Sequence, residues 1–122
     1  MKHQRFTPTP GDSWRFVSQG KGPHLLLLHG LGASSFTWRH NLDFLSQRFT
    51  VTAPDLPGHG RSPAPLDGDY RVDTLAQGVV EFMDSRGIDR AALVGNSLGG
   101  GLATLIARRW PERVSEIGRA HV

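Results

Sequence analysis

The sequence predicts an α/β fold in which a mostly parallel sheet is flanked by helices. Three short apolar runs, at residues 24–29, 49–53 and 91–95, have the length of buried strands. The segments between and after these runs carry apolar residues at helical spacing. Strands that alternate with helices are typical of parallel sheets, and 122 residues suit one domain with one core.

The first strands are expected near the beginning of the domain. Residues 1–13 form a lead-in segment with a proline-rich stretch, and residues 14–17 predict a short strand. A turn follows at residues 20–23, and the strand at 24–29 comes next. The uninterrupted apolarity of that strand indicates burial on both faces, as in a parallel sheet covered by helices.

A first helix is expected from Ser35 onward. Trp38, Leu42 and Leu45 stand at the i, i+4 and i+7 positions of one helix face. Residues 49–53 return to a strand, which completes a β-α-β unit. Residues 54–65 are dense in proline and glycine and predict a loop.

A second and a third helix are expected after that loop. The second is marked by apolar residues at helical spacing: Val72, Leu75, Ala76, Val79 and Met83. Gly87, followed by Ile88, predicts its left-handed stop. A buried strand at 91–95 leads into a helix over 98–109, which Pro111 ends.

Composition excludes several classes of function. The chain has no cysteine, so disulfides and thiolate chemistry are excluded, and it fits a reducing, cytoplasmic compartment. The net charge is +3, but the basic residues are scattered and form no stripe for nucleic acid. No apolar run is long enough for a membrane span or a signal-peptide core, and no spacing predicts a metal site.

The densest chemical signal is a G-x-S-x-G motif between the strand at 91–95 and the following helix, spelled Gly95, Asn96, Ser97, Leu98 and Gly99. A serine on such a turn is held in a strained backbone conformation that exposes its hydroxyl, and side chains at the two glycines would clash with neighbouring elements. The start of the helix presents free N–H groups toward developing negative charge. As alternatives, Ser97 caps the helix, or the turn binds phosphate. The turn lacks the lysine and the glycine spacing of phosphate loops.

A second motif, His29-Gly30-Leu31-Gly32, follows the strand at 24–29, and a third, Asp55-Leu56-Pro57-Gly58-His59-Gly60-Arg61-Ser62, follows the strand at 49–53. With these motifs in this order, the chain from about residue 14 to 114 resembles the serine branch of the α/β-hydrolase superfamily. The resemblance implies the N-terminal half of an α/β-hydrolase fold, truncated before the later strands and the covering insertion.

The resemblance also implies roles for individual residues. Ser97 is the expected nucleophile, and the backbone N–H groups of Leu31 and Leu98 are the expected oxyanion hole. His29 is expected to support the loop rather than act as a base, and His59 to be a surface or hydrogen-bonding residue. Asp55 is expected to organise its own turn. No cofactor is implied.

The partners of Ser97 are missing from the recorded chain. In the family the triad runs serine, then acid, then histidine, and only Glu112, Glu116 and His121 follow Ser97 here. None of them lies after a later strand, so we expect this chain alone to be nearly inert. The strand at 91–95 is expected to be an uncovered sheet edge, which predicts poor solubility.

The last residues suggest why the recorded chain is short. Residues 117–122 can be spelled ATC-GGA-AGA-GCA-CAC-GTC, the beginning of a common short-read sequencing adapter, and the codon of Glu116 fits its leading AG. We therefore expect a partial α/β-hydrolase domain over residues 14–115, followed by an adapter-encoded tail over 116–122.

Together these observations predict an enzyme whose substrate is a small ester or related carbonyl compound, cleaved through an acyl-enzyme at Ser97. A narrower alternative is a carbon–carbon bond hydrolase of aromatic degradation, which has a similar elbow but usually a proline-containing stretch after His-Gly. A different alternative is a non-catalytic, hydrolase-like accessory protein that binds a partner. Substrate identity and oligomeric state stay open.

Overall fold

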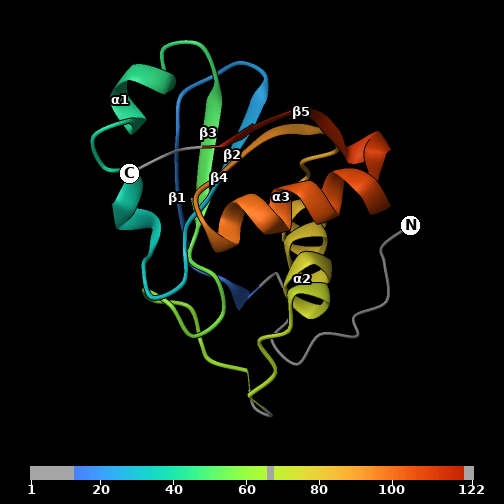
Figure 1. Ribbon diagram of the computed structural model, residues 1–122. Helices are drawn as coiled ribbons and strands as arrows, with labels where there is room; N and C mark the ends of the chain where they lie inside the picture. The colour runs from blue at the N-terminus through green and yellow to red at the C-terminus, as the bar shows by residue number, and fades with distance from the viewer. Residues whose placement is uncertain (1–12, 66–67, 120–122) are drawn as a thin grey trace.

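The computed structural model describes residues 13–65 and 68–119, and in them the predicted α/β fold is confirmed. A five-stranded sheet has the order β1-β3-β2-β4-β5 (Figure 1). The strands are β1 (Phe16–Gln19), β2 (His24–Leu28), β3 (Thr50–Pro54), β4 (Ala91–Gly95) and β5 (Val114–Arg119). The helical elements are η2 (Ser35–Trp38), α1 (Leu42–Leu45), α2 (Val72–Ser85), α3 (Leu98–Arg109) and η3 (Pro111–Arg113).

The sheet is mostly parallel, as the sequence predicts. Strands β3, β2, β4 and β5 pair in parallel, and only β1 is antiparallel to its neighbour β3. Strand β1 begins two residues later than predicted, at Phe16, and extends to Gln19. Because four parallel strands end at the same edge, the loops that follow β2, β3 and β4 meet there.

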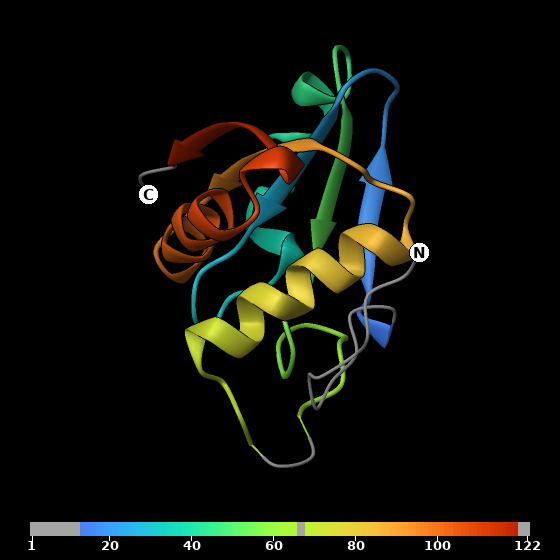
Figure 2. The ribbon, with the colours of Figure 1, turned by 90° about the vertical axis from the view of Figure 1, so that its right-hand side faces the viewer.

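Alternate residues of β2 enter the two halves of the core. Leu26 and Leu28 pack into the cluster formed with α2 and α3, whereas Leu25 and Leu27 pack with Trp38 on the opposite face. Helices α2 and α3 therefore cover one face of the sheet, and η2 and α1 lie on the other (Figures 1 and 2). No helix in the described ranges is long and apolar enough to cross a membrane.

The continuous helix expected from Ser35 is wrong, although its apolar face is confirmed. The segment divides into the 3₁₀ turn η2 and the one-turn helix α1. Trp38 is buried and Leu42 and Leu45 pack against the same cluster, so the spacing reports the correct face. The interruption falls at residues 39–41, where His40 and Asn41 are weak helix formers.

The end of α2 follows its prediction closely. Gly87 has φ +70°, and the N–H of Ile88 donates to Met83 O at 2.9 Å, which is the long bond of a Schellman motif. Arg113, the last residue of η3 and directly before β5, donates to Ile88 O at 2.8 Å and pairs with Asp84 at 2.8 Å. The side chain of Arg113 therefore joins the end of α2 to the last strand.

The expectation of an uncovered edge at β4 is wrong. Strand β5 pairs in parallel with β4, from Ala91 opposite Val114 to Gly95 opposite Arg119. A strand can form at residues 114–117 because successive side chains of a strand point to opposite faces, so only one face has to be apolar. Val114 is the buried apolar residue of that face. The strand spans the expected boundary at Ser115, so the adapter origin of residues 116–122 stays a prediction, and residues 120–122, including His121, lie outside the described residues.

Candidate active site

The strand-to-helix turn between β4 and α3 has the strained geometry expected of a nucleophile elbow. Ser97 has φ +58° and ψ −115°, and it is the one non-glycine residue with positive φ in residues 13–65 and 68–119. Such a conformation costs about 1–3 kcal/mol and persists only where the surroundings hold it. Ser97 is exposed, so its hydroxyl is accessible to a reactant.

Two glycines make this turn possible, as the sequence predicts. A Cβ on Gly95 would overlap the backbone of Gly99. A Cβ on Gly99 would lie 2.6 Å from the carbonyl carbon of Leu28 and 2.9 Å from His29 O. The start of α3 thus packs backbone to backbone against the end of β2. The N–H of Asn96 adds a bond of 3.0 Å to Leu28 O.

The Ser97 side chain does not cap α3, which removes the capping alternative. The first residues of the helix receive no side-chain cap from Ser97. Instead the turn faces the loop after β2: a Cβ on Gly30 would lie 3.3 Å from Ser97 Cβ and 3.8 Å from Ser97 Oγ. The structure therefore brings the first two sequence motifs together at one point.

The loop after β2 forms a tight turn next to Ser97. The N–H of Ala33 donates to Gly30 O at 3.1 Å, and Gly32 has φ +77°, which are the features of a type II turn. The backbone N–H groups of Leu31 and Leu98 have no acceptor in the part of the chain that the structure describes. Both expected oxyanion donors are therefore available to a ligand.

The side chain of His29 is hydrogen-bonded within this loop, and its role as a loop-supporting residue stays a prediction. It is fully buried, and its Nε2 accepts from the N–H of Leu56 at 3.0 Å. A backbone N–H only donates, so the proton of the neutral ring lies on Nδ1, which donates to Gly30 O at 2.7 Å. Burial lowers the pKa of His29, with a smaller effect from nearby His59.

His59 is also hydrogen-bonded to this loop, and no local sequence pattern predicts that contact. Its Nε2 accepts from the N–H of Gly32 at 2.9 Å, and its Nδ1 donates to Pro57 O at 3.0 Å. The rings of His59 and His29 lie 5.0 Å apart, centroid to centroid. His59 is thus a hydrogen-bonding residue, as expected, but its partner is the candidate oxyanion loop.

Asp55 joins three segments rather than only its own turn. One carboxylate oxygen accepts from the N–H of Ser35 at 2.6 Å, and the other accepts from the N–H of Arg61 at 3.2 Å. The carboxylate also lies against Gly60, whose Cβ would be 2.6 Å from either carboxylate oxygen. Asp55 is buried, so these charge-assisted bonds fix the loop after β3 against η2.

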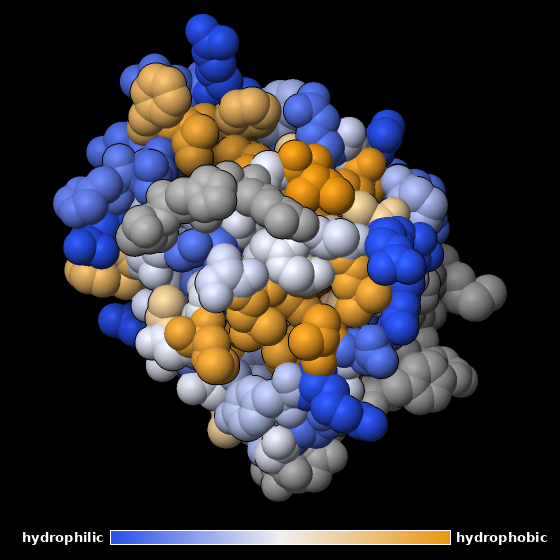
Figure 3. All heavy atoms as spheres, in the orientation of Figure 1, coloured by the Kyte–Doolittle hydropathy of each residue, from blue (hydrophilic) through white to orange (hydrophobic). Residues whose placement is uncertain are grey.

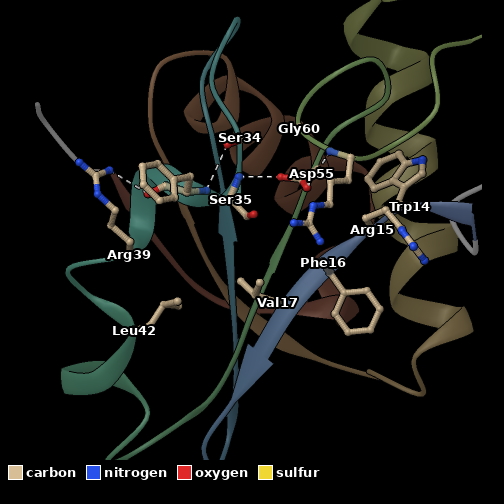
Figure 4. A pocket seen from close by; sticks show the side chains of 12 residues that line it. Trp14, Arg15, Phe16, Val17, Ser34, Ser35, Arg39, Leu42, Asp55 and Gly60 are labelled. Atoms are coloured by element: carbon tan, nitrogen blue, oxygen red, sulfur yellow. Dashed lines mark hydrogen bonds between the residues drawn. The ribbon is translucent and has the colours of Figure 1, made fainter.

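A cavity of about 550 Å³ lies beside Asp55 rather than at Ser97. It is bounded by β1, by η2 and by the loop that carries Gly60, and Figure 4 shows Arg15, Arg39, Phe16 and Val17 around it. Ser97, Leu31 and Leu98 are not among its walls. This cavity is therefore separate from the candidate nucleophile Ser97, which is exposed.

The triad acid and histidine are not assembled in the described residues. There, no hydrogen bond joins the Ser97 hydroxyl to a carboxylate or an imidazole, and no cluster of metal-ligating side chains is found. Glu112 lies in η3 and Glu116 is exposed on β5. The candidate site thus consists of a strained serine and backbone donors, without a base.

A mostly parallel sheet with helices on both faces, and a serine at positive φ between a strand and a helix, define the α/β-hydrolase class. The comparison with family models agrees: the alpha/beta hydrolase fold model matches residues 23–117. The chain belongs to the alpha/beta hydrolase fold family.

Individual relatives carry several activities in their names. An uncharacterized Mycobacterium tuberculosis protein is 42% identical over 93% of this chain and 33% of its own length. Bifunctional epoxide hydrolase 2 of Sus scrofa is 36% identical over 96% of this chain and 21% of its own length. The chain therefore spans a third or less of these curated relatives.

Solved structures of the same fold superpose closely on the chain. A marine microorganism esterase has a TM-score of 0.84 and 30% identity, over 90% of this chain and 42% of the esterase. A meta-cleavage product hydrolase from Pseudomonas fluorescens has a TM-score of 0.80 and 32% identity, over 85% of this chain and 39% of the hydrolase.

Proposed function

We propose that the protein is a serine hydrolase that cleaves a small carboxylic ester through an acyl-enzyme at Ser97. The observation that carries this proposal is the positive φ of Ser97, a strained conformation at a residue whose side chain does not cap α3. The hydroxyl oxygen attacks the ester carbonyl carbon, and the bond to the leaving alcohol breaks as the alcohol takes up a proton. Water then cleaves the acyl-enzyme, which releases the carboxylic acid and restores the serine.

Two backbone donors support the negative charge that develops on the carbonyl oxygen. The N–H of Leu98 lies at the start of α3, whose dipole places partial positive charge there. The N–H of Leu31 lies in the turn that begins at Gly30, and Gly30 packs closely against Ser97. In enzymes where one such donor was removed, the activation free energy rose by about 2.7–4 kcal/mol.

The base and acid of the triad are proposed to lie in the whole protein after Ser115. Without a base, the serine hydroxyl is a poor nucleophile at neutral pH. Relatives that the chain covers only to a third have room for further strands and loops. Reading the source locus through the Ser115 codon checks this: an Asp or Glu and then a His should follow, and an in-frame stop after Val122 would contradict the proposal and its adapter explanation.

The side chain at position 97 favours an ester over an epoxide. In the epoxide-hydrolase and dehalogenase branches a carboxylate stands on the elbow, whereas this chain has Ser97. The exposed Leu31, 74% accessible, offers an apolar contact beside the nucleophile. Figure 3 shows that apolar side chains gather in patches on the face of the molecule in view. An ester with an apolar acyl or alcohol group suits such a surface.

A carbon–carbon bond hydrolase is the second candidate, because a meta-cleavage product hydrolase is among the structural neighbours. A substrate panel separates the two proposals: the whole protein is assayed with p-nitrophenyl esters and with meta-cleavage products. Turnover of the esters alone supports the first proposal, and faster turnover of the meta-cleavage products supports the second.

The role of Ser97 is tested by labelling with a fluorophosphonate probe. We expect the whole protein to be labelled at Ser97, and Ser97→Ala to lose both labelling and turnover. Ser115→Ala is the matched control, because Ser115 is exposed on β5, away from the elbow, and should leave both unchanged. Full turnover in Ser97→Ala would refute the proposed function.

A further inference from the structure

Each of the two peptide groups that flank Leu31 is hydrogen-bonded to a histidine side chain. One histidine precedes the turn, and the other comes from the loop after β3. Gly30 O, in the peptide before Leu31, accepts from His29 Nδ1 at 2.7 Å. The N–H of Gly32, in the peptide after Leu31, donates to His59 Nε2 at 2.9 Å. The candidate oxyanion donor therefore lies between two peptides whose orientations are fixed from outside the turn.

The peptide held by His59 is the one that decides the type of turn. In a turn from Gly30 to Ala33, the central peptide joins Leu31 to Gly32, and type I and type II turns differ by a rotation of this peptide of about 180°. Gly32 has φ +77°, which belongs to type II. In that orientation its N–H reaches the unprotonated nitrogen of His59, whereas a rotated peptide would present a carbonyl oxygen to it.

We propose that His59 is a positioning residue for the oxyanion loop: by accepting from Gly32 N–H it fixes the central peptide of the turn, directly after the peptide that carries the Leu31 N–H. This inference rests on the proposed function. It gives His59 a role that it performs through the loop, without contact to the substrate. His29 is buried beneath the loop, whereas His59 is half-buried and comes within reach of protons from solvent.

The bond requires the neutral form of His59. Protonation would place an N–H on Nε2 opposite the N–H of Gly32, and two donors cannot form a hydrogen bond. The ionisable groups around His59 are His29 at 5.0 Å, Asp55 against Gly60, Arg61 on the same loop, and Tyr70, whose hydroxyl packs on Gly58. The arrangement that holds the Gly32 amide therefore includes a neutral ring at position 59.

Kinetics of the whole protein form the first arm of the test. His59→Leu removes the acceptor, and we expect kcat on an ester to fall by about tenfold to a hundredfold, less than a missing oxyanion donor costs, with KM within about twofold. His59→Gln places an amide oxygen near Nε2 and should recover most of kcat. His40→Leu is the control, because His40 is an exposed loop residue. Unchanged kcat in His59→Leu would overturn the inference, as would an equal loss in His59→Gln.

An NMR titration forms the second arm and does not depend on turnover. Labelling with carbonyl-¹³C leucine and ¹⁵N glycine selects Leu–Gly peptides, and these 122 residues contain two, at Leu31–Gly32 and Leu98–Gly99. The amide of Gly99 donates to Asn96 O and serves as an internal reference. We expect the Gly32 amide to shift on acidification in the unmodified protein but not in His59→Gln, while the Gly99 amide stays in place in both.

The two arms separate the inference from the proposed function. If Ser97→Ala keeps its turnover, the proposed function fails, and the Gly32 amide still reports whether His59 holds the loop. If Ser97 is the nucleophile but the Gly32 amide titrates equally in His59→Gln, the positioning role of His59 is wrong.

Discussion

The contact of Gly99 with the end of β2 predicts a large loss of stability when a single methyl group is added. In Gly99→Ala the new Cβ would lie 2.6 Å from the carbonyl carbon of Leu28 and 2.9 Å from His29 O. Both neighbours are backbone, so neither can rotate away. The nearest atom is the carbonyl oxygen of Leu28, so restoring an ordinary distance of about 3.4 Å requires the start of α3 or the end of β2 to move by more than an ångström.

The cost of that movement can be estimated from the packing of α3. Leu102, Ala103 and Ile106 are fully buried in the core, so a displaced helix loses contacts along its length. Overpacking of this kind costs about 1–3 kcal/mol and more where backbone must move, while alanine in place of glycine returns up to about 1 kcal/mol of helix propensity. We expect Gly99→Ala to lower the free energy of unfolding by about 2–3 kcal/mol.

Gly101 provides a control in the same helix. A Cβ at Gly101 meets nothing within 4 Å, so Gly101→Ala should stabilise the protein by about 0.5–1 kcal/mol through helix propensity alone. Urea unfolding followed by circular dichroism measures both variants. Unaltered stability in Gly99→Ala, or a loss in Gly101→Ala as large as in Gly99→Ala, would refute the argument that backbone contact fixes the elbow.

Three other changes probe charged groups. Arg113→Met should cost about 2–3 kcal/mol in urea unfolding, because it removes the ion pair of the largely buried guanidinium with Asp84 and its hydrogen bond to Ile88 O; a cost below 0.5 kcal/mol would contradict this. Burial lowers the pKa of His29 below 6.5, so the unfolded chain binds more protons than the folded chain near that pH. The free energy of unfolding should therefore fall as pH falls through about 6.5, and His29→Gln should weaken this dependence on pH. The Arg71 side chain holds the pKa of Asp69 far below its usual range, so the stability from Asp69 is complete above about pH 4 and is lost below it; thermal melting of Asp69→Asn should show a shallower acid slope, and an unchanged slope would exclude the effect.

The sequence predicts most of the fold because the signals it uses are local. The apolar runs of β2, β3 and β4 are buried strands, and helix α3 matches its predicted range. Two elements differ from the prediction, and both lie where the apolar pattern of the sequence is weak. The helix after Ser35 breaks where poor helix formers meet a capped 3₁₀ turn, and β5 forms where the sequence shows only Val114 as a buried apolar residue.

The candidate site is predicted to the level of motifs but not of contacts. Gly95 and Gly99 report the elbow because the requirement for glycine is visible in the sequence. By contrast, the bond between His59 and Gly32 joins residues 27 positions apart, and the bond between Asp55 and Ser35 spans 20 positions. Such bonds depend on how the loops after β2 and β3 meet at the sheet edge, which no local pattern encodes.

The candidate site is built from the loops that follow three neighbouring parallel strands. Strands β2, β3 and β4 are neighbours, so the loops that follow them supply the strained Ser97, the donors Leu31 and Leu98, and the histidine that holds Gly32. All of these act through backbone geometry, which the first strands can set without help from later ones. His29 cannot serve as a base for Ser97, because both of its ring nitrogens are engaged within the loop. The bonds that hold His29 within the loop after β2 therefore also keep it from transferring a proton at Ser97, and under the proposed function the base is a different residue.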